Sequence, residues 1–571
     1  MSAALLPLFV AVPLMMAALL VIVGDRRVVH AVGPLGTMIT AVGAAVLLIL
    51  EFRSGGAIAH GISSWPFGIA IPFVADMFTA LMLVVTGLLT IVCSWFAIAS
   101  RRAASVYFAP LVLVLTAGVN GALLTADLFN LFVFIEVMLL PSYGLFVLAA
   151  RHKGTLQQVA GARLYVTLNL LTSTVFLIGV GFIYGTAGTV NMAELAGLAT
   201  TDPTVAISGA VCLFALGIKA SVVPVHGWLA AAYPATSPAI TALFSGLHTK
   251  VAIYGIYRMY AVIFDGDSRW LWIGVTMFCL TMIIGVLGAV GEKTTRSILA
   301  FHMISQIGYI LLGVALFTLA GLTAGIFYLL HHMIVKASLF LSTGAVEVRH
   351  GTGEIGKLSG IAKREPVIAV AFFIAALSLA GLPPFSGFVA KFTLILASVE
   401  AGQIAAVVVM LLVSLITLLS MLKIWNGVFW GDSKSSEKTS TSNADDDAPA
   451  ASPADGDLPE ASPSGTAAAS TSGRKQSVAE PASVAQSSGG VATKEAPTAS
   501  ATRADPETRA SSATAVAERP RIGMALAGPA VFTAATTLGL GLGAELLLGL
   551  SATAAEGLLD TTAYVQAVMG S

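Results

Sequence analysis

Apolar residues fill most of this chain in long runs, and polar residues are confined to short breaks between the runs. A run of about 20 apolar residues is long enough to cross a bilayer as a helix. The pattern predicts about fourteen spanning helices, at 3–23, 30–50, 73–99, 106–125, 128–149, 160–185, 204–229, 237–262, 270–290, 296–317, 320–345, 367–397, 402–430 and 522–551. We therefore expect an all-α polytopic membrane protein.

The composition supports this assignment and excludes several function classes. Of the 571 residues, 57% are apolar and 11% are charged, whereas soluble domains carry about 25% charged residues. A net charge of zero argues against binding to nucleic acid. The three cysteines lie far apart inside apolar runs, which fits neither a disulfide framework nor a metal site. We expect a lipid-embedded protein that is not itself an enzyme and has no cofactor or metal.

One segment differs from the rest of the chain. Residues 433–520 contain no Phe, Trp, Tyr, Ile or Met and are rich in Ala, Ser, Thr and Pro. Such a segment buries too little apolar area to offset its ordering entropy, so we expect disorder. The predicted organisation is a membrane domain over 1–432, a linker over 433–520, and a last spanning helix with a tail over 521–571. The linker is either a docking tail or a tolerated insertion, and we favour the insertion.

The basic residues are distributed unequally between the two sides of the predicted bundle. Loops after odd-numbered spans contain thirteen lysines and arginines, while loops after even-numbered spans contain three, Arg53, Arg258 and Arg269. Under the positive-inside rule the odd-numbered loops face the cytoplasm. Both termini are then outside, and the linker is cytoplasmic. The thirteen are Arg26, Arg27, Arg101, Arg102, Arg151, Lys153, Arg163, Lys293, Arg296, Arg349, Lys357, Lys363 and Arg364.

Five charged residues lie too deep in predicted spans to reach an interface: Glu136, Lys219, Lys250, Lys336 and Lys391. Each lysine costs roughly 2.5–3.5 kcal/mol at a helix centre on insertion scales. They could form static interhelical pairs, but one carboxylate cannot neutralise four ammonium groups. This mismatch favours titratable groups that relay protons.

Prolines predict a break in two of these helices. Span 7 has Pro224 five residues after Lys219, and span 12 has Pro383 and Pro384 shortly before Lys391. Proline removes a backbone donor and clashes with the preceding turn. The two breaks suggest inverted five-helix repeats, spans 4–8 and 9–13, as in many transporters. Ordinary proline kinks are the alternative, which the neighbouring lysines make weaker.

Histidine and lysine also occur together in span 11. His332 and Lys336 are four residues apart and share one helical face, which suits proton transfer. His331 points about 100° away, so a packing role is expected for it. No histidine pair has a carboxylate at metal-ligand spacing.

Other polar residues near the spans are less informative. Lys423 and Asp76 lie near helix ends and can reach an interface. His226 and His248 flank the turn between spans 7 and 8, and either an accessory or a structural role is open for them. His302 is left undecided.

Several motifs resemble the antiporter-like subunits of respiratory complex I. They are FNLFVFIEVMLLPSYGL, IKASVVPVHGWLAAAYPATSPAITALFSGLHTKVAIYGIYR, TTRSILAFHMISQIGY, HHMIVKASLFLSTGAV and GLPPFSGFVAKF. Within that group, the chain is most similar to the D subunits of Mrp-type multisubunit cation/proton antiporters. The resemblance covers the fourteen spans and excludes the linker.

The resemblance implies a function and a set of site residues. It places the proton path on a mid-membrane axis of Glu136, Lys219, Lys250, His332, Lys336 and Lys391. The expected function is proton translocation within a heteromeric Na⁺ or K⁺/proton antiporter of a bacterial plasma membrane, with other membrane subunits as partners. The alternative is a proton-pumping subunit of a complex I or membrane-bound hydrogenase assembly.

Overall fold

The structure is a computed structural model, and it describes residues 2–24, 27–65, 70–101, 105–150, 156–431 and 521–570. The predicted linker over 433–520 lies outside the described residues, as do four of the basic loop residues used for orientation, Arg26, Arg102, Arg151 and Lys153.

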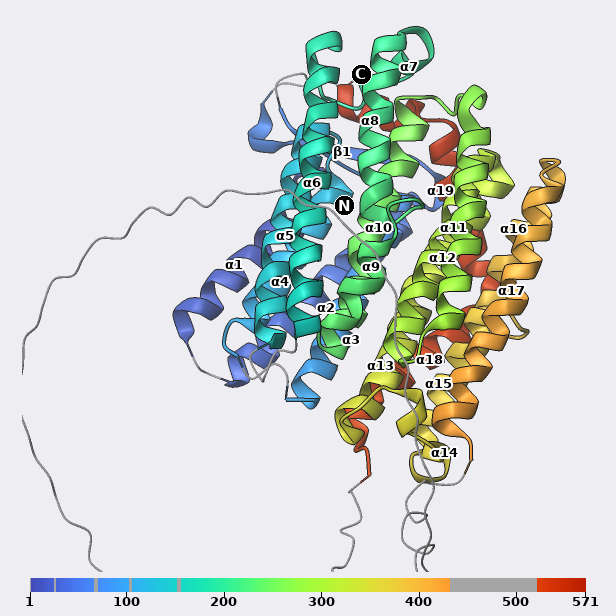
Figure 1. Ribbon diagram of the computed structural model, residues 1–571. Coiled ribbons are helices and arrows are strands. Elements are labelled where there is room, and N and C mark those ends of the chain that lie inside the picture. Colours follow the sequence, from blue (N-terminus) through green and yellow to red (C-terminus); the bar gives the residue numbers. More distant parts are fainter. Residues whose placement is uncertain are drawn as a thin grey trace, which may run out of the picture. The chain divides into compact units, whose positions relative to one another are not determined.

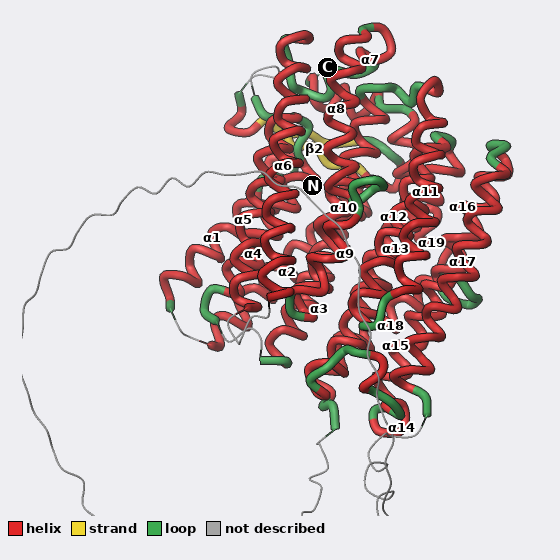
Figure 2. The backbone as a smooth tube through the Cα atoms, viewed as in Figure 1, coloured by secondary structure: helices red, strands yellow, loops and turns green. Residues whose placement is uncertain are grey.

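Helices make up nearly all of the described chain (Figure 2). The α-helices are α1 Leu8–Val23, α2 Arg27–Glu51, α3 Met77–Ala99, α4 Phe108–Leu124, α5 Leu128–Ala150, α6 Leu156–Ala187, α7 Leu198–Thr201, α8 Pro203–Ala220, α9 Gly227–Ala232, α10 Pro238–Val262, α11 Leu271–Gly291, α12 Thr295–Leu316, α13 Leu319–His350, α14 Ile361–Arg364, α15 Pro366–Ala380, α16 Ser386–Glu400, α17 Ile404–Ile424, α18 Met524–Leu542, α19 Ala544–Leu559 and α20 Thr562–Met569. The strands are β1 Ala57–Gly61 and β2 Pro72–Asp76. Short 3₁₀ turns span Ala3–Leu5, Phe52–Ser54, Ile62–Ser64, Tyr233–Ala235, Ser268–Trp270 and Ile355–Lys357, and a π-helical turn spans Trp425–Phe429.

Within the described residues, 12 helices are long and apolar enough to cross a membrane, which makes this a polytopic helical membrane protein. Figure 1 shows α10, α12 and α13 between α1 on one flank and α16 and α17 on the other. These three central helices are almost completely buried, whereas in α1, α2, α11 and α17 no more than 33% of the most apolar stretch is buried. Polar residues in a membrane protein concentrate on helices shielded from lipid. The inner position of α10, α12 and α13 therefore determines where the candidate site lies.

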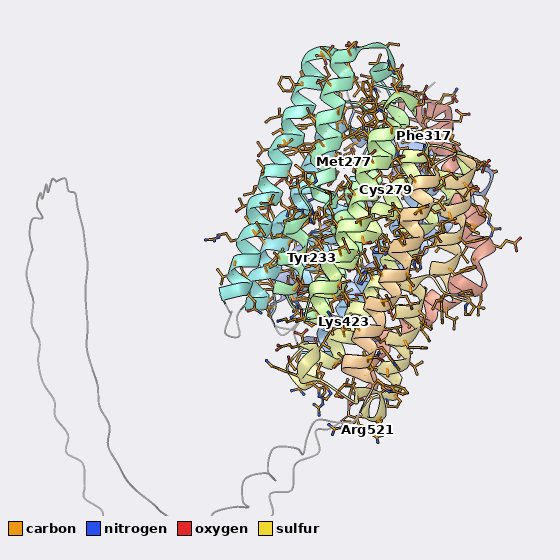
Figure 3. The ribbon with its side chains drawn as sticks, turned by 45° about the vertical axis from the view of Figure 1, so that its right-hand side comes forward. Tyr233, Met277, Cys279, Phe317, Lys423 and Arg521 are labelled. Atoms are coloured by element: carbon orange, nitrogen blue, oxygen red, sulfur yellow. The ribbon has the colours of Figure 1, made fainter. Side chains whose placement is uncertain are left out.

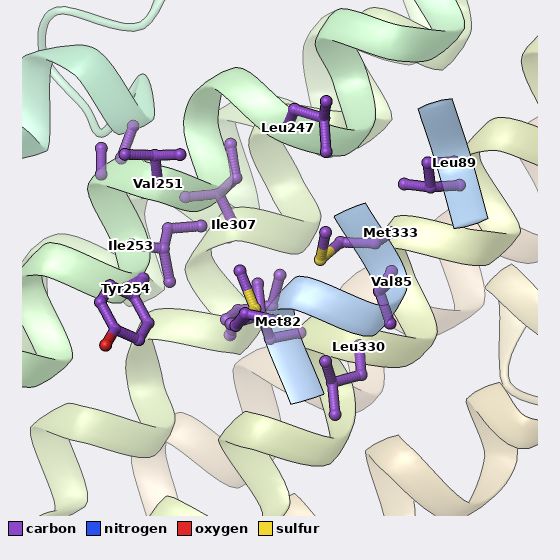
Figure 4. Packing of buried hydrophobic residues seen from close by; sticks show 14 of the residues in the cluster. Met82, Val85, Leu89, Leu247, Val251, Ile253, Tyr254, Ile307, Leu330 and Met333 are labelled. Carbon is purple, nitrogen blue, oxygen red and sulfur yellow. The ribbon is translucent and has the colours of Figure 1, made fainter. Parts of the chain in front are cut away.

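Apolar side chains hold the central helices together. In Figure 4, Met82, Val85 and Leu89 of α3 lie among Leu247 of α10 and Met333 of α13. All five are buried in the main hydrophobic cluster. Since lipid is as apolar as these side chains, close van der Waals packing is what favours helix contact here.

The helix pair α11–α12 depends on glycine for its close approach. A β-carbon on Gly285 would overlap the backbone nitrogen of Ser305, a contact that no side-chain rotation relieves. We expect Gly285→Ala to destabilise the subunit by about 1–3 kcal/mol through overpacking. Heating of the purified protein followed by size-exclusion chromatography measures the effect. Gly181→Ala is the matched control, because nothing lies within 4 Å of the added carbon; an unchanged midpoint for Gly285→Ala would contradict the close packing.

Residues 73–76, assigned to span 3 from the sequence, are not helical. They belong to β2, which pairs antiparallel with β1 so that Ala57 faces Asp76 and Gly61 faces Pro72. Asp76 ends the strand and caps α3 by accepting a hydrogen bond from the backbone N–H of Thr79, at 2.9 Å. The two strands have too few residues and too little alternation to stand out beside a long apolar run.

Arg258, expected from the sequence to be a loop charge, lies inside α10 and is only 1% exposed. Its Nη2 atom is 2.7 Å from Oδ2 of Asp76, so it has a partner that the sequence did not indicate. The expectation that Asp76 reaches an interface is likewise wrong, because Asp76 is buried.

The C-terminal region has more helix than predicted. The chain turns at Gly543, continues as α19 to Leu559, and ends in α20, which packs on β1 and β2. The tail expected after span 14 is thus a folded cover over the strand pair.

Candidate functional site: a buried row of ionisable side chains

The first helix break lies between α8 and α9. α8 ends at Ala220, and Ser221 adopts a left-handed conformation with φ 69°. The backbone groups freed by the break find partners: Trp228 donates to the carbonyl of Ile218 at 3.0 Å, and the Val223 N–H donates to Oγ1 of Thr281 at 3.2 Å. Non-helical backbone at membrane depth is stable only when it is satisfied in this way.

Lys219 lies one residue before this break and is 3% exposed. Its Nζ donates to Oδ1 of Asn169 on α6 at 3.2 Å. Glu136 of α5 interacts with Lys219 electrostatically, and its own buried Oε1 has no hydrogen-bond partner among the described residues. The interaction of Glu136 with Lys219 is therefore an electrostatic one, and no hydrogen bond between these two side chains is found among the described residues.

The second break lies between α15 and α16. Gly381 follows α15 with φ 89°, and a β-carbon there would come within 2.6 Å of Cδ of Lys391, so glycine is needed for both reasons. Lys391 is 5% exposed and donates from Nζ to the free carbonyl of Ala380 and to Oγ of Ser414, each at 2.9 Å. Its Nζ also lies 5.3 Å from the centre of the Tyr309 ring. The carbonyl released by the break thus solvates the ammonium group.

Lys219, Lys391 and the buried ionisable side chains described next are here called the row. Two further members come from α10, and both are fully buried. His248 contacts Oγ of Ser142 through Nε2 at 3.1 Å and the hydroxyl of Tyr165 through Nδ1 at 2.6 Å. Lys250 donates to Oγ1 of Thr249 at 3.0 Å. A lysine has three N–H donors, so this bond leaves two of them for water or for a proton acceptor.

α13 supplies His332 and Lys336. Neither ring nitrogen of His332 has a hydrogen-bond partner among the described residues, although the ring is completely buried. Lys336 donates to the carbonyl of Leu299 at 3.0 Å. His332 interacts electrostatically with both Lys250 and Lys336, which joins α10 to α13. Buried, unsatisfied imidazole nitrogens are costly, and they suit a group that exchanges protons with its neighbours.

A packing role was expected for His331 from its helical spacing. The structure instead shows a polar contact with the second break. The Nδ1 atom of His331 lies 2.8 Å from Oγ of Ser386, the first residue of α16, and Lys391 acts on its ring electrostatically. His331 therefore joins α13 to the second break. The contact spans 55 positions in the sequence, so helical spacing alone cannot reveal it.

The histidines left open from the sequence fall into two groups. His248 interacts electrostatically with Lys219, which places it in the row. His302 contacts Oγ of Ser420 through Nε2 at 2.8 Å and interacts with Lys336 and Lys391, so it belongs there too. His226 precedes α9 at the end of the first break, and no contact in the described residues joins it to the row.

Static pairing does not account for these charges. Among the described residues, the four deep lysines donate to neutral oxygens and form no ion pair. Lys423 differs, because it donates to the carbonyls of Val290 and Glu292 at a helix end, which fits a structural role. In the part of the chain that the structure describes, no group of three His, Cys, Asp or Glu residues could hold a metal ion.

The chain is similar to known proteins over nearly all of its described length. Residues 125–417 match the family described as NADH:quinone oxidoreductase/Mrp antiporter, TM. The D subunit of the Na(+)/H(+) antiporter of Alkalihalophilus pseudofirmus is 40% identical over 422 residues, which are 72% of this chain and 83% of that one. The D subunit of the Na(+)/H(+) antiporter of Bacillus subtilis is 35% identical over 438 residues, 75% of this chain and 87% of that one.

Solved structures give the same result. A chain in the structure of the Mrp complex from Dietzia sp. DQ12-45-1b has a TM-score of 0.85 and 51% identity, with 100% of both chains covered. A chain of respiratory complex I from Thermus thermophilus has a TM-score of 0.66 at 20% identity, covering 95% of this chain and 98% of that one, and so shares the fold.

Proposed function

This chain belongs to the Mrp antiporter family as a D subunit, and we propose that it carries protons along its buried row in a monovalent cation/proton antiporter. It is a multi-pass protein of the bacterial plasma membrane, a transporter subunit and not an enzyme, and it works with other membrane subunits. The single observation that carries the proposed path is the set of four buried lysines that form no ion pair within the part of the chain that the structure describes, two of them beside helix breaks.

The row gives a chemical sequence for proton movement. A proton on Lys219 is stabilised by the charge of Glu136 and is released when that charge is removed or screened. The next groups are His248 and Lys250 on α10, followed by His332 and Lys336 on α13. From there the proton passes to Lys391 through His302 and His331, which interact with it. Each step transfers one proton from a nitrogen atom of one side chain to a nitrogen atom of the next.

We further propose fourteen spans with two inverted five-helix repeats. The 12 long helices supply twelve of these spans. The other two are α4 and the broken pair α15–α16, which are apolar but shorter. In the set α4, α5, α6, α8–α9 and α10, and again in α11, α12, α13, α15–α16 and α17, the broken helix is the fourth member. Each set therefore contributes one break and its lysine to the row.

The proposed orientation places both termini outside and the 433–520 linker in the cytoplasm. Figure 3 shows Lys423 and Arg521 toward one end of the bundle and Phe317 toward the other. The described loops at the Arg521 end include Lys357, Lys363 and Arg364, in the direction that the positive-inside rule requires.

The linker is proposed to act only as a connector. Deleting most of residues 433–520, while keeping a short Gly/Ser connector, should leave antiport close to the wild-type rate. Loop length contributes little entropy, and the connector must only join two chain ends. Exchange in vesicles, normalised to assembled complex, measures this. A loss of exchange in a fully assembled, shortened complex would instead assign a docking or regulatory role to the linker.

The function itself is tested with the whole assembly in inverted vesicles that hold an inside-acid pH gradient. Addition of Na⁺ or K⁺ should dissipate the gradient, and the chain should co-purify with other Mrp-type membrane subunits. Co-purification with iron–sulfur or nickel proteins, and no response to either cation, would contradict the antiporter function.

A further inference from the structure

A second cluster of buried polar residues lies at the end of the bundle opposite Arg521, outside the row of lysines and histidines. Its members come from three distant parts of the chain: Asp76 at the end of β2, Tyr254 and Arg258 on α10, and Tyr564 on α20. Figure 1 shows the C-terminus and β1 at this end.

The cluster continues the row along a single helix face. Lys250, Tyr254 and Arg258 are spaced four residues apart on α10 and therefore lie one above the other. All three are buried, with Lys250 at 0% and Arg258 at 1% exposure. This face of α10 therefore carries polar side chains from Lys250 to Arg258, the partner of Asp76.

Hydrogen bonds connect the members of the cluster to one another. Arg258 Nη2 donates to the hydroxyl of Tyr254 at 3.1 Å and pairs with Asp76 Oδ2 at 2.7 Å. The Tyr254 hydroxyl donates to the carbonyl of Leu123 at 2.9 Å and lies 2.8 Å from Oγ1 of Thr79. Thr79 in turn donates to Asp76 Oδ1 at 2.9 Å. The Asp76–Arg258 ion pair and the hydroxyls of Tyr254 and Thr79 thus form one connected hydrogen-bonded network.

Stability alone does not explain this ion pair. Burying two opposite charges costs desolvation that their attraction often fails to repay. Two nitrogens of Arg258, Nε and Nη1, also have no hydrogen-bond partner among the described residues. An arrangement that leaves such strong donors unsatisfied fits a closed state that water can enter when the cover moves.

The cover is α20. The ring of Tyr564 lies over the guanidinium group, 4.7 Å from Cζ of Arg258, and the helix packs on the strand pair that ends at Asp76. Asp560 and Thr561 connect α20 to α19. Tyr564 and Val568 are the side chains that it buries.

We propose that Asp76 and Arg258, covered by Tyr564, form the gate through which the proton row opens to water at this end of the protein. The gate rests on the proposed function, since it presupposes proton transfer as far as Lys250. Arg258 does not release protons itself, because its guanidinium stays charged. Its fixed charge repels metal cations from the row, while Asp76 and the Tyr254 hydroxyl give a proton a route past it.

The test uses assembled complex in proteoliposomes, with passive proton leak measured in cation-free buffer and exchange measured after cation addition. Tyr564→Ala should raise the leak above wild type, because the cover over Arg258 is lost. Tyr564→Phe is the matched control and should behave as wild type, because it keeps the ring. Equal leak for Tyr564→Ala, Tyr564→Phe and wild type would overturn the proposal.

A second variant protects the test against misfolding. The pair Asp76→Asn with Arg258→Gln removes both charges together, so neither is left buried and uncompensated. For a purely structural ion pair, this double variant should assemble and exchange normally. For a gate, it should assemble yet lose most of its coupled exchange. Variants of the row lysines serve as inactive controls in the same preparations. If these are inactive while the double variant exchanges at the wild-type rate, the gate is rejected and the proposed function stays intact.

Discussion

Replacing Lys391 with arginine will stop cation-driven proton movement as completely as replacing it with alanine. Alanine removes the proton carrier, and arginine keeps the charge but cannot deprotonate, since its pKa exceeds about 12. The same result is expected at Lys219, next to the other helix break. The rate of pH-gradient dissipation in vesicles, divided by the amount of assembled complex, measures both variants.

Lys423→Arg is the matched control for this experiment. Lys423 donates to two backbone carbonyls at a helix end and takes no part in the buried row, so arginine should support near wild-type exchange there. If Lys391 and Lys219 were fixed counter-charges, arginine would rescue them as well. A near wild-type rate for either variant would remove that lysine from the relay.

Removing the carboxylate of Glu136 should abolish or severely reduce antiport with little effect on assembly. Its buried Oε1 has no partner, so Glu136→Gln and Glu136→Ala break no hydrogen bond that the described residues make to that atom. Taking a charge out of the membrane also relieves an insertion cost, so a loss of exchange would be functional and not structural.

Immunoblots of the assembled complex and exchange rates in the same vesicles separate the two effects. Glu400→Gln, at the exposed end of α16, is a suitable control and should exchange normally. Wild-type exchange in an assembled Glu136→Gln complex would show that the charge of Glu136 does not act on Lys219 during transport.

The helices and most of the row follow from the sequence because a charge inside an apolar run has few explanations. Lys250 and Lys336 each interrupt such a run, and proline marks the breaks beside Lys219 and Lys391. These signals are local, so they need no knowledge of which helices touch. Family motifs around the same positions made the resemblance specific, and the similar chains support it.

Contacts between distant segments are what the sequence did not provide. Asn169, Ser414 and Ser386 supply oxygens to the row, yet a polar side chain in a spanning helix most often bonds its own backbone, as Thr90 does with Thr86. Only tertiary packing distinguishes the two cases.

The Asp76–Arg258 pair illustrates the same difficulty. An arginine near the end of α10 has the sequence signature of an interfacial loop charge. What buries it is the docking of α20 more than 300 positions away, together with a strand pair too short to predict. Neither α20 nor the strand pair, which supply the other side of these contacts, has a recognisable sequence pattern of its own.

The central claim is that protons cross this protein on titrating lysines when the complex exchanges cations. Its most direct test records proton flux and Na⁺ or K⁺ flux together in proteoliposomes of wild-type and Lys391→Arg complex, matched for assembly. The account predicts coupled fluxes in opposite directions for wild type and the loss of both in the variant. Undiminished, coupled fluxes in the Lys391→Arg complex would contradict it.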